Sequence, residues 1–167
     1  MNVLLIGNAV SMIGCLIMVL IGFLKKNHQV LIAQSVQCLF MGAGNLILGG
    51  ISGFISNVVT ILRNVVFLKC KNTVFLKIFF ILLQLVLSWS SLTTGFISWL
   101  PLIAAALFTW CMDTKSPAKL KICILCTQVL WFVYDFTHFN YVASAFDVMT
   151  FLSTIIGLYM VCKQKNR

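Results

Sequence analysis

The chain has 167 residues, of which 61% are hydrophobic and only 9% are charged, and its mean hydropathy is +1.06. A soluble domain is about 45–50% apolar and about 25% charged, so this composition excludes a soluble enzyme, a disordered tail and a nucleic-acid-binding module. The net charge of +9 does not indicate nucleic acid, because the basic residues form short clusters between long apolar stretches. The sequence therefore predicts a small, all-α, polytopic membrane protein whose first partner is the lipid bilayer.

Seven apolar stretches, separated by short polar segments, predict seven transmembrane helices. They cover residues 2–24, 30–48, 51–68, 73–92, 96–112, 118–138 and 141–162. Each is close to the length of about 20 residues that a bilayer requires. The first stretch has neither a charged start nor a cleavage site, so it predicts a span rather than a signal peptide.

The distribution of lysine and arginine predicts how these helices are oriented. Eleven of the 12 basic residues cluster around the ends of the first, third, fifth and seventh helices, and the twelfth, Arg63, lies inside the third. Cytoplasmic loops carry an excess of Lys and Arg. We therefore expect a multi-pass membrane protein, with the N-terminus outside and the C-terminus in the cytoplasm.

The predicted helices divide into two triplets joined by a single helix. Residues 1–72 form a first three-helix bundle, residues 73–95 a linker helix, and residues 96–167 a second bundle with a short basic tail. A shift of 90 residues superposes the triplets without a gap. The polar positions that correspond under this shift are Asn57 with Asp147, Thr60 with Thr150, Asn64 with Thr154 and Asn45 with Asp135. Spacings of three and four place such residues on one helical face, which predicts a parallel repeat about an axis along the membrane normal.

Ionisable residues inside predicted spans are candidates for function, because burying them in lipid is costly. Arg63 either extends toward the cytoplasmic headgroups or is buried, bonded to Asn64 or to a neighbouring helix, as a donor for a carboxylate or phosphate. Asp147 lies about two turns inside the last helix, and we expect it to face a cavity. A lone carboxylate there needs a cation, a proton or hydrogen-bond donors, and Arg63 is an alternative internal partner for it.

Two further helical faces carry polar side chains. Gln128, Trp131, Asp135 and His138 share one face of the sixth helix, which is typical either of a binding surface or of an aromatic belt at the membrane interface. Gln34, Gln37, Met41 and Asn45 lie near one face of the second helix, where amides commonly join neighbouring helices. The candidate substrate-binding residues are Asn57, Thr60, Arg63, Asn64, Trp131, Asp135, Asp147 and Thr150.

The sequence predicts no catalytic residues, no metal site and no cofactor. Cys123 and Cys126 form a Cys-x-x-Cys pair inside an apolar stretch, without a second pair or a histidine at ligand spacing. Small buried cysteines that pack well are the simpler interpretation. A paired nucleophile and base, which an intramembrane enzyme would need, is not apparent either, so we expect a protein that is not an enzyme.

The stretch from Gly53 to Asn64, with its Arg-Asn pair, resembles the YgjV-type family of small bacterial inner-membrane proteins. The segments Trp99-Leu100-Pro101 and Trp131 to Asp135 fit the same family. The 3+1+3 plan also resembles the SWEET/PQ-loop (MtN3-like) transporter superfamily, which implies a SWEET-like arrangement of seven transmembrane helices and a relationship to sugar facilitators and vitamin-type nucleoside transporters. The paired asparagines of the sugar transporters correspond here to Asn57 and Asp147, which favours a cationic or amine-bearing ligand over a neutral sugar.

The sequence therefore predicts a transporter or facilitator for a small polar organic solute such as a sugar, nucleoside or vitamin. Alternating access would come from rocking of the two bundles, with Pro101 as a point of flexure. The alternative is a membrane receptor or assembly subunit that has the same fold and passes no solute. The substrate, the direction of transport, any coupled ion and the presence of a homo-oligomer are left open by the sequence.

Overall fold

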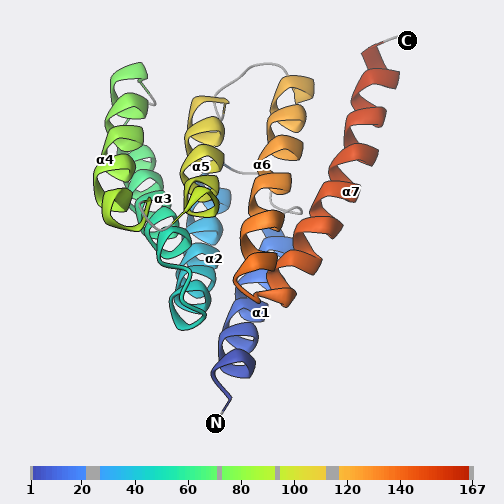
Figure 1. The fold of residues 1–167 in the computed structure, drawn as a ribbon. Coiled ribbons are helices and arrows are strands. Elements are labelled where there is room, and N and C mark those ends of the chain that lie inside the picture. The colour runs from blue at the N-terminus through green and yellow to red at the C-terminus, as the bar shows by residue number, and fades with distance from the viewer. Residues whose placement is uncertain (1, 22–26, 71–72, 93–94, 112–116, 166–167) are drawn as a thin grey trace.

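The computed structural model describes residues 2–21, 27–70, 73–92, 95–111 and 117–165, and all regular structure in these ranges is helical (Figure 1). The elements are α1 (Val3–Ile21), α2 (Asn27–Ile47), α3 (Ile51–Lys69), α4 (Val74–Leu92), the 3-10 helix η1 (Phe96–Trp99), α5 (Leu100–Cys111), α6 (Pro117–Thr137) and α7 (Tyr141–Lys165). The predicted all-helical fold is confirmed. Each helix lies where an apolar stretch predicts it, although η1 occupies the start of the fifth.

Two of these helices meet the length and hydropathy expected of a membrane span, namely Ile51–Lys69 in α3 and Tyr141–Tyr159 in α7. The other apolar segments of the described chain are shorter, covering Val3–Met18, Leu31–Ile47, Val74–Trp89 and Phe96–Cys111. Seven membrane crossings therefore stay a prediction.

The turns after α2 and α6 have the same backbone geometry, 90 residues apart. Gly49 has a φ of +83° and Phe139 a φ of +59°. The amide of Gly50 donates to the carbonyl of Asn45 at 2.7 Å, and the amide of Asn140 donates to that of Asp135 at 2.9 Å. This bond across five residues, together with a left-handed residue after the helix, is the Schellman motif. The same C-terminal cap therefore ends α2 and α6. Helices α3 and α7 begin one residue after Gly50 and Asn140, respectively.

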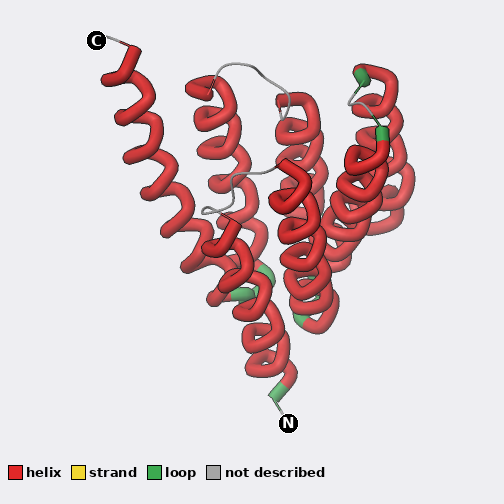
Figure 2. Tube along the Cα trace, turned by 180° about the vertical axis from the view of Figure 1, so that it is seen from behind, coloured by secondary structure: helices red, strands yellow, loops and turns green. Residues whose placement is uncertain are grey.

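The helices pack in two connected triplets. In the first half α2 packs against α1 and α3, and in the second half α6 packs against α5 and α7. Contacts of α1 with α7 and of α3 with α5 join the halves, while α4 packs on α3 and α5 (Figure 1). Figure 2 shows from behind that α7 leans away from α6 toward its C-terminal end. The ends of α2 and α6 thus lie where both halves meet.

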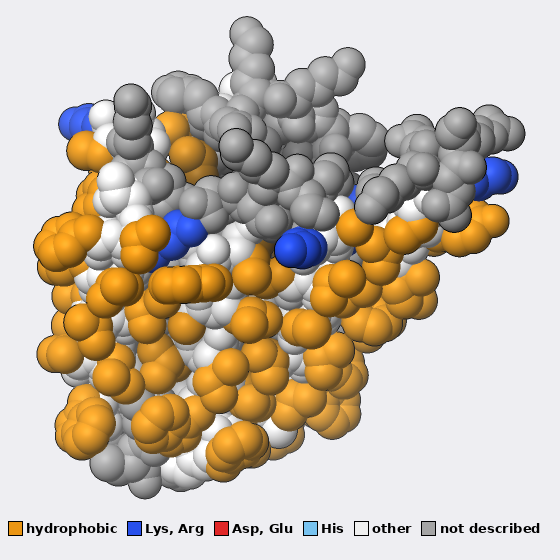
Figure 3. Space-filling model, turned by 90° about the horizontal axis from the view of Figure 1, so that it is seen from above, with side chains coloured by type: hydrophobic (Ala, Val, Ile, Leu, Met, Phe, Trp, Pro, Cys, Tyr) orange, Lys and Arg blue, Asp and Glu red, His pale blue; other side chains and the backbone are white. Residues whose placement is uncertain are grey.

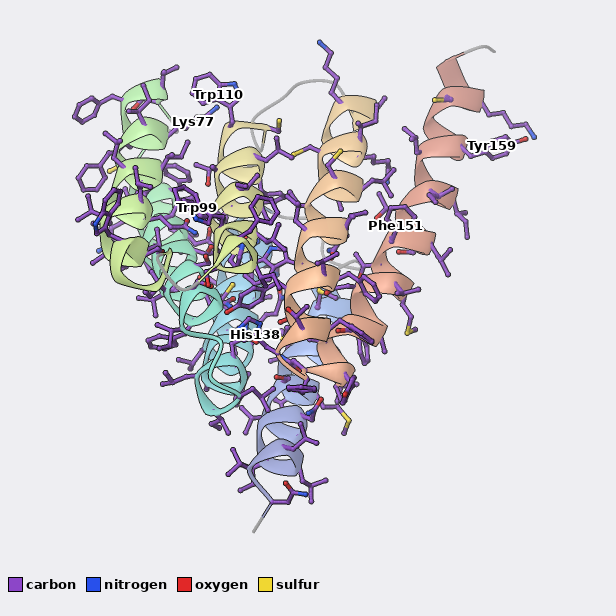
Figure 4. The ribbon with its side chains drawn as sticks, viewed as in Figure 1. Lys77, Trp99, Trp110, His138, Phe151 and Tyr159 are labelled. Atoms are coloured by element: carbon purple, nitrogen blue, oxygen red, sulfur yellow. The ribbon has the colours of Figure 1, made fainter. Side chains whose placement is uncertain are left out.

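Helix α4 is attached to one helix of each half by polar side chains. The amide of Gln84, only 3% exposed, donates to the hydroxyl of Ser56 on α3 and to the carbonyl of Pro101 on α5. At one end of α4, Lys77 Nζ donates to the carbonyl of Trp110 at 3.1 Å and lies 5.8 Å from the centre of its ring (Figure 4). Pro101 lies in the first turn of α5, where its missing amide hydrogen is not needed.

The polarity of the fold is the reverse of that in a soluble protein. Among the described side chains, 17 polar or charged residues are buried, against 11 hydrophobic ones. Large apolar side chains cover the outside, for example Leu5 at 68%, Phe75 at 76% and Val86 at 70% exposure. In water this surface would aggregate, whereas in a bilayer it faces lipid and leaves the hydrogen-bonding groups to pair inside.

The described lysines gather at one end of the helices. Lys69 ends α3, Lys77 begins α4, Lys119 and Lys121 begin α6, and Lys163 lies in the last turns of α7. Figure 3 views this end and shows lysine or arginine side chains with no acidic side chain visible. The remaining predicted members of this charge cluster, Lys25, Lys26, Lys71, Lys115 and Arg167, lie outside the described residues, and the Lys165 side chain is not described.

Candidate functional site

The buried polar side chains form two main groups. We name the first the arginine cluster, which consists of Gln34 on α2, Arg63 and Asn64 on α3, and Thr109 on α5. We name the second the acidic cluster, which consists of Cys15 on α1, Asp135 on α6 and Asp147 on α7. Each group draws side chains from both halves of the molecule.

In the arginine cluster Arg63 is 2% exposed, and its guanidinium donates hydrogen bonds to neutral groups. Nη1 donates to Thr109 Oγ1 at 2.8 Å, and Nη2 donates to Asn64 Oδ1 at 3.1 Å. Thr109 in turn donates to the carbonyl of Ala105, and Asn64 donates to Gln34 Oε1 at 3.1 Å. The guanidinium also lies 5.6 Å from the ring centre of Phe108. Of the two interpretations of Arg63, the structure shows the buried one.

Arg63 is not the partner of Asp147. Its described hydrogen bonds go to Thr109 and Asn64, which carry no charge. A guanidinium has five N–H donors, and three of them are used in these contacts. The remaining donors and the uncompensated positive charge suit an anionic group, which is the chemistry that the sequence suggested for a buried Arg63.

A third set of contacts joins the halves near the turns after α2 and α6. The Tyr134 hydroxyl on α6 accepts a hydrogen bond from the Gly53 amide on α3 at 2.7 Å and lies 3.2 Å from Ser52 Oγ. Asn140 Nδ2 donates to Asn45 Oδ1 at 2.9 Å. Gly53 is required for this contact, because a Cβ there would lie 2.5 Å from Tyr134 Cε1.

The acidic cluster differs from the other two groups because its oxygens lack partners. Asp135 is 0% exposed and Asp147 is 6% exposed. Both carboxyl oxygens of Asp135, and Oδ2 of Asp147, have no hydrogen-bond partner among the described residues. The two carboxyl groups lie within electrostatic range of each other, and the thiol of Cys15 lies within range of both. Two more buried atoms without partners, Ser11 Oγ and Asn45 Nδ2, lie on the neighbouring helices α1 and α2.

Asp147 also lines a cavity of about 140 Å³ between α6 and α7. The other lining residues are Gln128, Val129, Phe132, Val148 and Phe151. Figure 4 shows Phe151 on α7, in the gap where α7 leans away from α6. Gln128 Oε1 is buried here without a hydrogen-bond partner. The cavity is therefore mainly apolar, with one amide and one carboxylate as its polar groups.

The remaining predicted site residues lie on α3, α6 and α7 but are not brought into one site. Asn57 is buried and donates to the carbonyl of Gly53 in its own helix at 2.9 Å. Thr60 and Thr150 are half-buried. Trp131 is half-buried and meets Tyr134 edge to face at 5.9 Å. The role of these residues in binding, and the facing of Asn57 with Asp147, stay predictions.

Several residues of these clusters were not selected from the sequence. Tyr134 was not among the predicted site residues, although it connects the two halves. Asn140, Ser11 and Cys15 were not predicted as site residues either. The 90-residue correspondence of Asn45 with Asp135 was the one available signal. The amides of α2 do join helices as expected, through Asn45 to Asn140 and Gln34 to Asn64.

The cysteine pair of α6 is divided between two environments. Cys123 is buried with its thiol 3.5 Å from the carbonyl of Leu107, whereas Cys126 is exposed. All seven cysteines are free, and the described residues contain no group of three or more His, Cys, Asp or Glu arranged to hold a metal ion.

Comparison with known proteins relates the whole chain to one family. Residues 5–165 match the family Imp-YgjV, described as bacterial inner membrane protein. No curated protein and no solved structure matches the chain. The match agrees with the apolar exterior and the polar interior of the helices. The chain therefore belongs to the Imp-YgjV family of bacterial inner membrane proteins.

Proposed function

We propose that this protein is a transporter or facilitator for a small polar organic solute, such as a sugar, nucleoside or vitamin. The observation that carries the proposal is the interior of the acidic cluster, where buried carboxyl oxygens have no partners. Such groups are costly in a membrane protein and by default mark a pathway or a binding site. A purely structural core would pair these oxygens, as it pairs Asn45 with Asn140.

The proposed architecture is seven transmembrane helices in a 3+1+3, SWEET-like arrangement. Its support is the register of the two halves: α2 and α6 begin and end 90 residues apart, α1 and α5 end 90 residues apart, and the Schellman turns coincide. Helix α4 contacts one helix of each half, as a connecting helix should. In this proposal the halves rock against each other about the contacts of Tyr134 and Gln84.

The proposed topology places the N-terminus outside and the C-terminus in the cytoplasm. It is supported by the lysines gathered at one end of the described helices. Reporter fusions test it directly: a fusion after Arg167 should behave as cytoplasmic and a fusion near Thr94 as external. A cytoplasmic signal at Thr94 would contradict the seven-helix topology.

The solute that fits best carries a cationic or amine group, because carboxylates occupy the positions of the second half where the first half has Asn45 and Asn57. Its anionic groups, where present, would be bound by Arg63. A metabolite screen by thermal shift on the purified protein, followed by flux into liposomes, tests the proposal. The Asp147→Asn variant should lose the response to the solute. Thr127→Val is a matched control, because this buried threonine on α6 bonds only to its own helix.

Binding without flux would favour the alternative, a receptor or assembly subunit. In that case the thermal shift would persist in detergent while proteoliposomes accumulated no more solute than empty liposomes. Flux that depends on Asp147 would exclude the receptor interpretation.

A further inference from the structure

The acidic cluster brings together two carboxyl groups that come from different helices. Asp135 lies near the end of α6, and Asp147 lies in the second turn of α7, so the turn after α6 folds one toward the other. Three of their four oxygens are buried and have no hydrogen-bond partner among the described residues. Two carboxylates that are buried and lie within electrostatic range of each other cannot both remain ionised without a counter-charge.

The described surroundings supply no cation to balance them. Helix α1 contributes the Cys15 thiol and α6 itself contributes the Tyr134 hydroxyl, both within electrostatic range of Asp135, while the neutral amide of Asn45 on α2 bonds to Asn140 in the turn after α6. The His138 ring stacks on Tyr134 at 4.3 Å, with Nδ1 3.0 Å from the carbonyl of Tyr134. The buried cation of α3, Arg63, is bonded within its own cluster.

The remaining cations of these helices lie far along them. Lys121 on α6 lies beside Gly157 of α7, more than two turns from Asp147 along the chain. Lys119 lies in the first turn of α6 and Lys163 near the end of α7. Among the described residues, no lysine or arginine is therefore placed beside the pair.

A metal cation fits this cluster poorly. A hard cation such as Ca²⁺ takes about six to eight oxygen ligands. The acceptor oxygen of Asn45 is occupied by Asn140, which leaves the carboxyl oxygens, the Ser11 hydroxyl and Gln128 Oε1 as the unpaired oxygens among the described residues of these helices, fewer than such an ion requires. No metal-binding group of acidic, histidine and cysteine side chains occurs among the described residues. A proton needs only a single oxygen, and it removes one of the two negative charges.

We infer that Asp135 and Asp147 form a proton-binding pair, which holds one proton at neutral pH and exchanges it with water through the cavity beside Asp147. The protonated pair carries one negative charge instead of two. Asp147 is the member that lines the cavity between α6 and α7, so exchange passes through its carboxyl. The proton pair itself does not depend on transport. The inference rests on the proposed function in one step only, in which the exchanged proton acts as the coupling ion of the transporter.

The composition of the chain allows a direct measurement. The protein contains three aspartates and no glutamate, and the third aspartate is Asp113. Asp113→Asn protein, made by cell-free synthesis with aspartate that carries ¹³C in its side-chain carboxyl, has the labelled group only in Asp135 and Asp147. Infrared spectroscopy in nanodiscs should then show a labelled carboxylic acid band at neutral pH, which disappears only in alkaline buffer. The band should shift in D₂O, because the proton exchanges through the cavity.

Two results would overturn the inference. If the labelled band is absent at neutral pH, both carboxyls are ionised. If it is present but does not shift after long incubation in D₂O, the proton is locked and the pair does not exchange with water.

The Asp135→Asn variant, made in the same labelled protein, tests the pairing. The titration of the remaining Asp147 band should change when its partner is replaced, and an unchanged titration means that the carboxyls act independently. None of these measurements needs a transported solute. A negative result in the liposome flux assay would therefore contradict transport but not the proton pair. Absence of the labelled carboxylic acid band would contradict the proton pair but not transport.

Discussion

The two halves of the molecule share a backbone plan but differ in side-chain chemistry. The first half has Gly42 and Gly44 on α2, whereas the second half has Phe132 and Tyr134 at the corresponding positions of α6. A Cβ at Gly42 would lie 3.1 Å from Asn57 Cβ, so α2 and α3 are in close contact. Phe132 instead lines the cavity between α6 and α7. A glycine therefore allows close contact in one pair of helices, whereas a phenylalanine lines a cavity in the equivalent pair.

The charges are divided in the same way. The buried cation, Arg63, belongs to the first half, where its second-half counterpart is the exposed Ser153. Both buried acids belong to the second half, opposite the amides Asn45 and Asn57 in the repeat. The comparison teaches that a repeated backbone can keep its register while its interior diverges into a tightly packed, cationic half and a looser, acidic half.

The largest loss of stability is expected from a substitution in the arginine cluster of the first half. Asn64→Leu removes the acceptor for Nε and Nη2 of Arg63 and leaves the buried guanidinium under-satisfied, which should lower the free energy of unfolding by about 3 kcal/mol. Chemical unfolding in detergent measures it. The control is Thr154→Val at the corresponding position of α7, where the hydroxyl bonds only to the carbonyl of Thr150. Equal losses in both variants would contradict the assigned role of Asn64.

The next effect concerns the contact between the halves. Gly53→Ala installs the residue that the second half carries at position 143, but the new methyl group meets the Tyr134 ring and the Asn45 amide. Overpacking of this kind should cost about 1–3 kcal/mol. Gly157→Ala is the matched control, because its methyl group meets only the flexible Lys121 side chain. Similar thermal unfolding of the two variants would show that the Tyr134 contact is loose.

A smaller effect is expected at the two helix stops. Gly49→Ala places a Cβ at a φ of +83° in otherwise open space, so it should cost about 1 kcal/mol from backbone strain alone. Phe139→Asn should instead raise the free energy of unfolding by about several tenths of a kcal/mol, because asparagine tolerates the left-handed region better than phenylalanine does. Thermal unfolding of the single variants tests both. A loss of stability in Phe139→Asn would mean that the phenylalanine ring contributes packing that outweighs its strain.

The smallest expected effect on stability is that of Asp147→Asn. Arg63 is bonded to Thr109 and Asn64, so this change leaves no cation unpaired, and the free energy of unfolding should change by less than about 1 kcal/mol. Removal of the partner of a buried ion pair would cost about 3–5 kcal/mol. A loss of that size would show that Asp147 neutralises a cation after all. Unchanged solute binding together with unchanged stability would leave Asp147 without a role in either.

Much of the fold follows from the sequence alone. Hydropathy predicts all seven helices, because an apolar stretch bounded by lysine, glycine or proline is a local property of the chain. The 90-residue register follows from the same local signals, and it reappears in the bounds of α2 and α6 and in the turns that end them. The buried state of Asn57, Asn64, Asp135 and Asp147 also agrees with their spacing on helical faces.

The partners of these residues were decided only by the tertiary structure. Spacing places a side chain on a face but does not say which helix that face meets or how closely. Arg63 reaches Thr109 because α3 packs on α5, and Tyr134 reaches Gly53 because the glycine leaves room for its ring. Asp135 and Asp147 come together because the turn after α6 folds α7 back along α6. Hydropathy depends on neighbours in sequence, whereas hydrogen bonding inside a membrane depends on neighbours in space, so the sequence determined the helices and the packing determined the clusters.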